Sequence, residues 1–254
     1  MITLLKVAIS ALTSFLYMNI FKLSKIRKMP ERERVFKSRR LLKKLSKRML
    51  KSAQITLEVV YIDKMAIDQL NLDDGIVFVS NHQSNIDIPV IVVGLNMPVG
   101  FVAKKEMESW PFYSTWMKLS NCIFLDRSNP REGIKSIKKA VDIVKDGYPT
   151  VIFPEGERST DGKVKKFKKG SFKLALDADG IIIPLTVDGT FSVQKRGEKK
   201  INSKKKVKLT VGKPLKLKEM DKNLKNTLND YVQKTIESEM WKKQSNNDHL
   251  NGIN

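Results

Sequence analysis

Cysteine is nearly absent from this sequence. Cys122 is the single cysteine among 254 residues, which excludes an intramolecular disulfide and any zinc site built on paired cysteines. It lies in the apolar run 122–125, where a buried structural thiol is far more common than a nucleophile. A Gly-x-Ser-x-Gly nucleophile elbow is also missing. The sequence therefore suits a reducing compartment and offers no convincing covalent nucleophile.

Acidic residues are few by comparison with basic ones. The chain has 27 Asp and Glu against 48 Lys and Arg, a formal net charge of +21, which predicts an anionic partner, either nucleic acid or an acidic membrane surface. The basic residues gather at 22–48, 163–169 and 195–208. Any one of these clusters could equally be a solvated face, so charge alone does not choose the partner.

Long unbroken hydrophobic runs are scarce too. Residues 1–21 are mostly apolar but are interrupted by polar side chains, namely Lys6, Ser10, Thr13, Ser14 and Asn19. About 20 residues of helix cover roughly the thickness of a bilayer core. We therefore expect an anchor helix that either spans the bilayer or enters one leaflet. A signal peptide is disfavoured because no small-x-small cleavage site precedes the basic stretch that follows.

Residues 30–53 alternate Arg and Lys with apolar residues at helical spacing. This pattern predicts a basic amphipathic helix of the kind that lies in an anionic lipid interface. Together the two helices are expected to form a membrane-docking segment, residues 1–53, that precedes one core domain of residues 54–241. The polar residues 242–254 are expected to form a disordered tail.

The core domain alternates strand and helix patterns. Short apolar runs rich in β-branched residues predict strands at 55–62, 75–80, 98–103, 121–125, 150–153, 180–187 and 206–211. An apolar stripe predicts a helix over 131–145, and a second helix is expected over 224–241. Alternation of this kind predicts an α/β fold with a largely parallel central sheet covered by helices on its faces.

Polar residues follow directly after the predicted strand 75–80. One of the two histidines, His82, lies here, and the other, His249, lies in the polar tail. His82 and Asp87 can meet if the histidine lies in the turn after the strand and the aspartate begins the next helix. The carboxylate would then fix one imidazole tautomer and leave the other nitrogen basic. A hydrogen-bonded loop histidine beside a helix-capping aspartate remains an equally good interpretation of these residues alone.

Two further strand ends carry residues suited to an anionic ligand. Phe153-Pro154-Glu155-Gly156-Glu157-Arg158-Ser159 follows the strand 150–153. Its glycine permits close backbone approach to a ligand, and Arg158 has the planar donor fork that suits a phosphate. Arg127 follows the strand 121–125. A turn with a surface ion pair would explain the first of these runs equally well.

These residues together resemble the motifs of the glycerophospholipid acyltransferase family, most closely its bacterial 1-acyl-glycerol-3-phosphate acyltransferases. The resemblance covers residues 60–214. His82-x4-Asp87, Phe124-x-x-Arg127, Phe153-Pro154-Glu155-Gly156-x-Arg158-Ser159 and the strand 182–185 match the four family motifs in order, and 103–106 resembles a segment between the first two. Glu157 stands where the family commonly has threonine, and Asn85 where it commonly has an aromatic or aliphatic residue, and neither position is the base or its orienting carboxylate.

The resemblance implies a role for each matching residue. His82 would abstract the proton of the acceptor hydroxyl, and Asp87 would orient the imidazole and stabilise the imidazolium. Arg158, with Arg127 and Lys104, would hold the acceptor phosphate. Glu155 and Gly156 would shape the acceptor pocket, and backbone N–H groups near Gly156 are candidates for binding the oxyanion.

The resemblance also implies the reaction and its setting. Residues 54–241 would form the catalytic domain, which transfers a fatty acyl chain from acyl-CoA or acyl carrier protein to the sn-2 hydroxyl of lysophosphatidic acid and gives phosphatidic acid. No acyl-enzyme intermediate, cofactor or metal is needed. We expect the protein to bind anionic membrane lipids at the cytoplasmic face of the plasma membrane.

Three alternatives remain from the sequence. The motifs barely distinguish lysophosphatidic acid from glycerol 3-phosphate or another lysophospholipid as the acceptor. The lysine clusters favour a nucleic-acid-binding module, but no aromatic residues are interleaved with them and the N-terminus is apolar. A catalytically silent lipid-binding scaffold is disfavoured by the intact His82 and Asp87.

Overall fold

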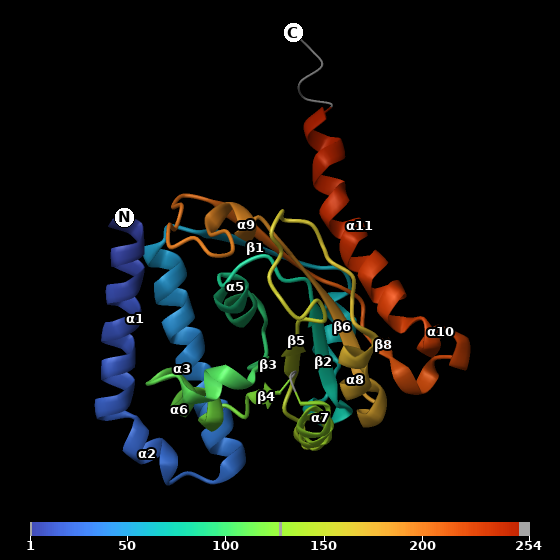
Figure 1. Cartoon of the computed structure of the whole chain (residues 1–254), viewed down its shortest axis with the longest axis horizontal. Coiled ribbons are helices and arrows are strands. Elements are labelled where there is room, and N and C mark those ends of the chain that lie inside the picture. Colours follow the sequence, from blue (N-terminus) through green and yellow to red (C-terminus); the bar gives the residue numbers. More distant parts are fainter. Residues whose placement is uncertain (1, 127–128, 249–254) are drawn as a thin grey trace.

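The computed structural model describes residues 2–126 and 129–248. Three helices come first: α1 Ile2–Phe21, α2 Leu23–Arg27 and α3 Glu31–Ser52. Glu31 and Glu33 lie in the first turn of α3, where negative charge is favourable toward the helix dipole. Helices α1 and α3 lie side by side at one end of the molecule, far from the C-terminal helix (Figure 1). Both expected N-terminal helices are thus present, while their docking to a membrane stays a prediction.

The core is one eight-stranded sheet in the order β1-β7-β6-β2-β5-β3-β4, with β8 paired to β6. Its strands are β1 Thr56–Tyr61, β2 Ile76–Ser80, β3 Gly100–Lys104, β4 Ile123–Leu125, β5 Thr150–Ile152, β6 Ile181–Asp188, β7 Lys206–Val211 and β8 Leu215–Lys216. Only the pairings of β6 with β7 and with β8 are antiparallel. The predicted α/β class with a largely parallel sheet is therefore confirmed.

The centre of the sheet is β2, which lies between β5 and β6. All five residues of β2 and all three of β5 are buried. Strands covered on both faces are expected to read as continuous apolar runs rather than as alternating ones. The β-branched runs noted in the sequence therefore mark the strands that carry the polar residues at their ends.

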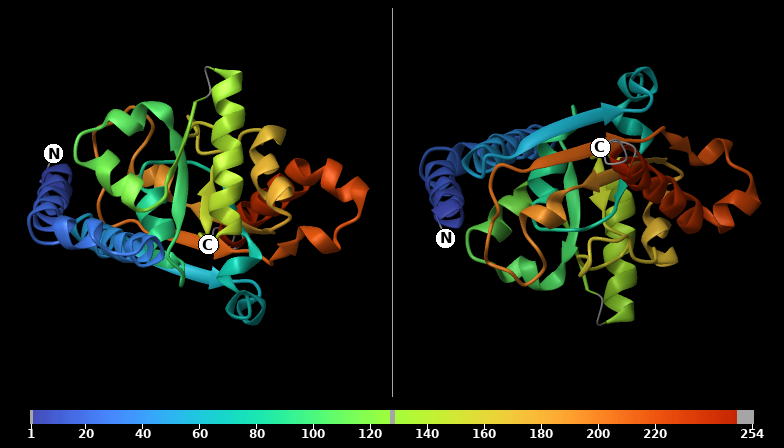
Figure 2. Two further views of the ribbon diagram at one scale, coloured as in Figure 1. Left: turned by 90° about the horizontal axis from the view of Figure 1, so that it is seen from below. Right: turned by 90° about the horizontal axis from the view of Figure 1, so that it is seen from above.

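Helices cover both faces of the sheet. The remaining elements are α4 Lys64–Asp68, η1 Leu72–Asp74, α5 Asp87–Gly94, η2 Lys105–Ser109, α6 Tyr113–Leu119, α7 Pro130–Lys145, η3 Lys169–Phe172, α8 Lys173–Ala178, α9 Thr190–Val193, η4 Leu217–Glu219, α10 Lys222–Asn226 and α11 Leu228–Asp248. One apolar cluster joins α5 and the end of α3 to one face of the sheet, and a second joins α7, α8 and α11 to the other. Figure 2 shows this layering from two sides.

Arg39 fixes α3 to the central sheet through the segments that precede β3, β4 and β5. Its guanidinium is buried and donates to the carbonyls of Pro98, Ser120 and Pro149, each of which lies shortly before a strand. Burial lowers the pKa of Arg39 to about 10. The division at residue 53 stays a prediction, but α3 packs into the α/β fold and is not a detached arm.

Three sequence expectations differ from the structure in detail. The terminal helix continues to Asp248 instead of ending at Trp241, because the polar residues that follow include good helix formers such as Lys and Gln. Strand β8 was not expected, since two residues leave no periodicity to detect. The apolar stripe that predicts the helix over 131–145 includes Ile134, which is exposed near the start of α7.

Candidate active site

His82 and Asp87 meet at the carboxyl end of β2. Helix α5 begins at Asp87, and the turn from 81 to 86 brings the imidazole back over it. His82 Nδ1 lies 2.7 Å from Asp87 Oδ2. The Asp87 side chain is fully buried, and that of His82 is largely buried. The geometry required for a tautomer-fixing pair, which the sequence left open, is present.

Further donors surround the Asp87 carboxylate and set its orientation. The backbone N–H groups of Gln83 and Ser84 donate to Oδ2 at 2.7 and 2.8 Å. The buried hydroxyl of Thr190, the first residue of α9, donates to Oδ1. Since Oδ2 already receives two N–H donors, the neighbouring Nδ1 is best satisfied as a third donor, which leaves Nε2 unprotonated. Within the described residues, Nε2 has no hydrogen-bond partner.

The loop after β5 makes three contacts with His82, one ring stacking and two hydrogen bonds. The ring of Phe153 stacks on the imidazole with centroids 4.0 Å apart. His82 N donates to Glu155 Oε1 at 2.7 Å, and His82 O accepts from Ser159 N at 2.8 Å. Strands β2 and β5 are parallel neighbours, so the sheet itself brings these two loops together.

The Glu155 carboxylate links the backbone of His82 to that of Lys165. Its second oxygen, Oε2, accepts from Lys165 N at 3.0 Å, and its side chain is buried. Burial raises the pKa of Glu155 to about 7, against the two backbone hydrogen bonds that lower it. Because both oxygens are engaged by backbone amides, Glu155 positions the loops around His82, and its expected contact with the acceptor remains a prediction.

Arg158 is half-buried in the same loop. Its guanidinium makes no hydrogen bond or ion pair within the described part of the chain. The neighbouring Glu157 is held by Lys165 at 2.8 Å and Arg196 at 2.7 Å. These two cations lower the pKa of Glu157 to about 2. Glu157, where the family commonly has threonine, therefore pairs with two nearby cations, and Arg158 is left available for an anion.

Gly156 has a φ of +79°, and its N–H donates to Phe153 O. Glycine adopts this left-handed conformation without steric cost. Because that N–H closes the turn, it is not an open oxyanion donor. Gly156 instead lines a hollow of about 410 Å³. The apolar wall and the lysine rim of this hollow are formed by Leu125, Ile137, Ile152, Lys138, Lys168 and Lys173.

The other expected residues lie farther along the sheet. Lys104 ends β3 and is exposed. Arg127 lies outside the described residues, and β4, which precedes it, is separated from β2 by β3 and β5. Cys122 precedes β4, at the opposite edge of the sheet from His82, and burial raises the pKa of its thiol. A nucleophilic role for this cysteine has no support in the geometry.

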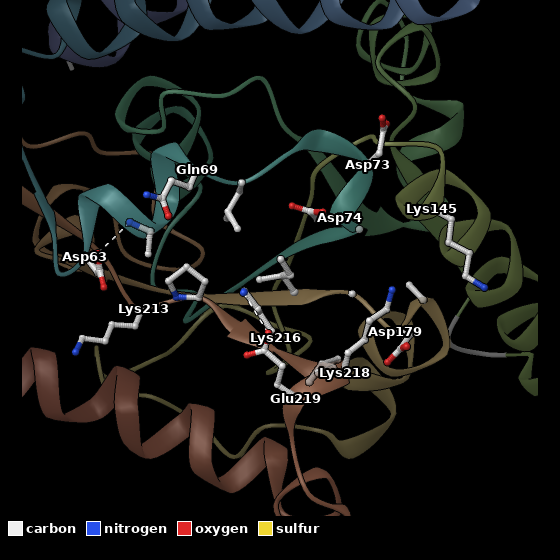
Figure 3. Close-up of a pocket in the computed structure, with 18 residues that line it drawn as sticks. Asp63, Gln69, Asp73, Asp74, Lys145, Asp179, Lys213, Lys216, Lys218 and Glu219 are labelled. Carbon is white, nitrogen blue, oxygen red and sulfur yellow. Dashed lines mark hydrogen bonds and ion pairs between the residues drawn. The ribbon is translucent and has the colours of Figure 1, made fainter.

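A larger hollow, of about 720 Å³, lies at the opposite edge of the sheet, where β2 and β6 begin (Figure 3). Its acidic side chains serve local structure: Asp63 Oδ1 accepts from Ala66 N, and Asp74 Oδ2 from Asn71 N. Among the described residues, no group of three or more His, Cys, Asp or Glu side chains is placed to hold a metal.

Sequence reasoning missed three contributors: the stacking role of Phe153, and the positions of Thr190 and Gln83. The Gln83 side chain donates to Gly162 O at 2.8 Å and lies 3.2 Å from Thr190 Oγ1. Thr190 follows the end of β6, so a polar residue at a strand end was an available signal. Its pairing with Asp87 requires the order of strands in the sheet, which the sequence pattern does not contain.

Comparisons with known proteins agree with the site. The family model described as Acyltransferase matches residues 61–188. A chloroplastic 1-acyl-sn-glycerol-3-phosphate acyltransferase from Brassica napus is 32% identical over 56% of this chain and 41% of its own length. A probable enzyme of the same name from Mycoplasma pneumoniae is 34% identical over 46% of this chain and 45% of its own length. The chain thus spans less than half the length of these relatives.

A solved structure extends the likeness to nearly the whole chain. The crystal structure of the 1-acyl-sn-glycerophosphate (LPA) acyltransferase PlsC from Thermotoga maritima matches with a TM-score of 0.78 at 25% identity, covering 95% of both chains. The matched region of the family model contains the His82–Asp87 pair, the Phe153–Ser159 loop and all of β6. On this evidence the chain belongs to the acyltransferase family.

Proposed function

We propose that this protein is a 1-acylglycerol-3-phosphate O-acyltransferase that makes phosphatidic acid from lysophosphatidic acid. The observation that carries the proposal is the His82 imidazole, fixed through Nδ1 by a buried carboxylate and open at Nε2 within the described residues. The names of the relatives from Brassica napus and Thermotoga maritima support the same reaction.

His82 is the general base in this proposal. Its Nε2 takes the proton of the sn-2 hydroxyl as the oxygen attacks the thioester carbon. The negative charge that develops on the thioester oxygen collapses as the C–S bond breaks, and the imidazolium returns the proton to the departing thiolate. Asp87 stabilises the imidazolium while it exists, and no acyl-enzyme forms.

Arg158 binds the acceptor phosphate. Its guanidinium is unpaired within the described residues and can make two parallel hydrogen bonds to a phosphate. Lys104, at the same edge of the sheet, adds a second cation, and we retain Arg127 as a third. A half-buried arginine fork of this kind suits the phosphate of an acceptor that remains near a lipid surface.

The donor is acyl-CoA or acyl carrier protein. The hollow beside Gly156 has an apolar wall that fits a hydrocarbon chain, and its lysine rim fits an anionic carrier. No residue described in the structure favours one of the two carriers over the other.

The enzyme works at a membrane, on its cytoplasmic face. Among the described residues, α1 is the one helix long and apolar enough to cross a bilayer, although 33% of its apolar window is buried inside the protein. Its partly buried face and the basic helix α3 beside it support attachment to an anionic surface.

Initial rates with a panel of acceptors and donors test this function. The purified full chain is supplied with oleoyl-CoA or oleoyl-acyl carrier protein, and with lysophosphatidic acid, glycerol 3-phosphate or lysophosphatidylcholine in vesicles. We expect phosphatidic acid as the main product. A clear preference for glycerol 3-phosphate, or no transfer with either donor, would contradict the assignment.

A further inference from the structure

The exposed apolar surface of this protein is concentrated in two segments. Eleven of the fifteen large hydrophobic side chains that are exposed among the described residues lie on α1 or on the turn 110–113. Eight are on α1, and the other three are Trp110, Phe112 and Tyr113. Contiguous exposed apolar surface of this kind marks an interaction site more often than scattered single residues do.

The turn 110–113 presents its aromatic rings in a fixed conformation. It connects η2 to α6, and Phe112, 62% exposed, has a φ of +64°. A bulky residue with positive φ is unusual and costs free energy. Trp110, 48% exposed, contacts Tyr113 edge to face with centroids 6.4 Å apart. The fold therefore holds a phenylalanine and a tryptophan outward on a turn with a strained backbone at Phe112.

This aromatic turn is continuous with α1. The ring of Tyr113 lies 4.7 Å from that of Phe15, in the middle of α1. Trp116 of α6 is buried in one apolar cluster with Ala11, Phe15 and Met18. The views from below and above agree that the segment around α6 lies beside the N-terminal helices (Figure 2). Segments about a hundred residues apart in the sequence thus pack against each other.

The charge around this surface indicates what covers it. Helix α2 follows α1 and carries Lys22, Lys25 and Arg27, with Lys28 at its end. Ile26 of α2 belongs to the same buried cluster as Trp116 of α6, so the helix that carries these cations and the helix that follows the aromatic turn share one cluster. Trp and Tyr concentrate at the boundary between lipid headgroups and acyl chains, and basic residues beside them favour anionic headgroups over an apolar protein partner.

We propose that the turn Trp110–Tyr113 is a second membrane anchor, whose aromatic rings enter the interface of an anionic phospholipid bilayer next to α1. The proposal rests on the membrane association proposed above. Two anchors at separate points fix the rotation of the enzyme about α1, which one helix cannot do. The turn is joined through η2 to Lys104, and Glu108 of η2 pairs with both Lys105 and Lys118. The anchor would therefore hold the strand end that carries Lys104 at the lipid surface.

Fluorescence of Trp110 tests the anchor directly. Wild type and Trp110→Phe are mixed with vesicles of phosphatidylcholine and phosphatidylglycerol, with and without brominated acyl chains. The difference between the two proteins isolates Trp110 without altering the buried Trp116. We expect this difference signal to shift to the blue and to be quenched by bromine. An unshifted, unquenched Trp110 on vesicles that bind the protein would overturn the proposal.

A binding experiment supplies the second measurement. Trp110→Ala/Phe112→Ala should partition onto the same vesicles on the order of tenfold more weakly than wild type, while Tyr231→Ala, exposed on α11 away from this surface, should bind normally. Equal binding of the double variant, or equal binding of wild type to pure phosphatidylcholine, would contradict an anionic-lipid anchor.

Activity in detergent micelles separates this proposal from the proposed reaction. The double variant should keep its acyl transfer rate there, because neither residue belongs to the catalytic machinery. Absence of transfer by wild type would contradict the reaction alone, since vesicle binding and Trp110 quenching do not depend on it. A matching loss of activity in micelles by the double variant would contradict a role confined to docking.

Discussion

The two edges of the central sheet differ in how they use polar residues. At the edge where β2 begins, the larger hollow is lined by exposed charges that cap short helices or pair locally. At the edge where β2 ends, buried polar groups from the ends of β2, β5 and β6 converge on one imidazole. We therefore base the proposed location of the reaction on the convergence of buried groups and not on the size of a hollow.

The pairing of strands explains this convergence. Polar side chains buried at the carboxyl edge require partners from neighbouring strands, because burial without a hydrogen bond is costly. Asp87, Thr190 and Glu155 meet this requirement through one another or through the backbone around His82. The opposite edge has no such constraint, since its charges remain in water.

Asp87→Asn should have the largest effect among the substitutions that test this difference. The N–H groups of Gln83 and Ser84 keep the amide oxygen toward Nδ1, so the tautomer is retained, but the neutral amide no longer stabilises the imidazolium that forms when His82 takes a proton. We expect kcat to fall by about 10²- to 10⁴-fold while the fold is retained. Rate measurements alongside circular dichroism check this, and a folded variant with full kcat would contradict the assigned role of Asp87.

Arg158→Ala should come next, through binding of the acceptor. Loss of a charge-assisted contact to phosphate is expected to raise KM for lysophosphatidic acid by about tenfold to a hundredfold. Arg158→Lys keeps the charge but not the planar fork, so its KM for lysophosphatidic acid should lie between those of wild type and Arg158→Ala. An unchanged KM in both variants would place the phosphate elsewhere.

Thr190→Val should reduce kcat by about tenfold, because one hydrogen bond to the Asp87 carboxylate is lost in a nearly isosteric change. Thr190→Ser keeps the hydroxyl and should restore kcat. If Ser and Val behave alike, Thr190 serves packing only.

The smallest expected effect concerns Glu155 and the pH dependence of the free energy of unfolding. Its folded pKa of about 7 lies above its ordinary value of 4.5, so the folded state holds a proton that the unfolded state has released between these values. The free energy of unfolding should therefore fall as the pH rises from 4.5 to 7, by on the order of 1 kcal/mol per pH unit at most. Unfolding in detergent at pH 5 and 7.5 measures this, and Glu155→Gln should lack the slope. The same change in the free energy of unfolding with pH for wild type and Glu155→Gln would contradict the role of Glu155.

Local patterns in the sequence predict much of this arrangement. β-branched apolar runs mark β2, β5 and β6, and the spacing of His82 and Asp87 fits a strand, a turn and a helix start. Each of these features involves residues that lie close together in the chain, so a single sequence is enough to predict it. The family motifs add roles for Glu155 and Arg158 that spacing alone would not assign.

Contacts between distant strand ends could not be predicted in the same way. Thr190 meets Asp87 because β6 lies beside β2, although 103 residues separate the two side chains. The aromatic turn meets α1 through Tyr113 and Phe15, which no periodicity relates. The two-residue strand β8 and the extension of α11 also escaped prediction, since their patterns are too short or too polar.

One measurement tests most directly whether the reaction belongs to the carboxyl edge of the sheet. Acyl transfer from oleoyl thioesters to lysophosphatidic acid in vesicles is compared for wild type, His82→Ala and Lys216→Ala/Lys218→Ala, the last altering the opposite hollow. The account predicts a loss of about 10²- to 10⁴-fold for His82→Ala and no loss for the lysine variant. A folded His82→Ala protein with full activity, or loss confined to the lysine variant, would contradict it.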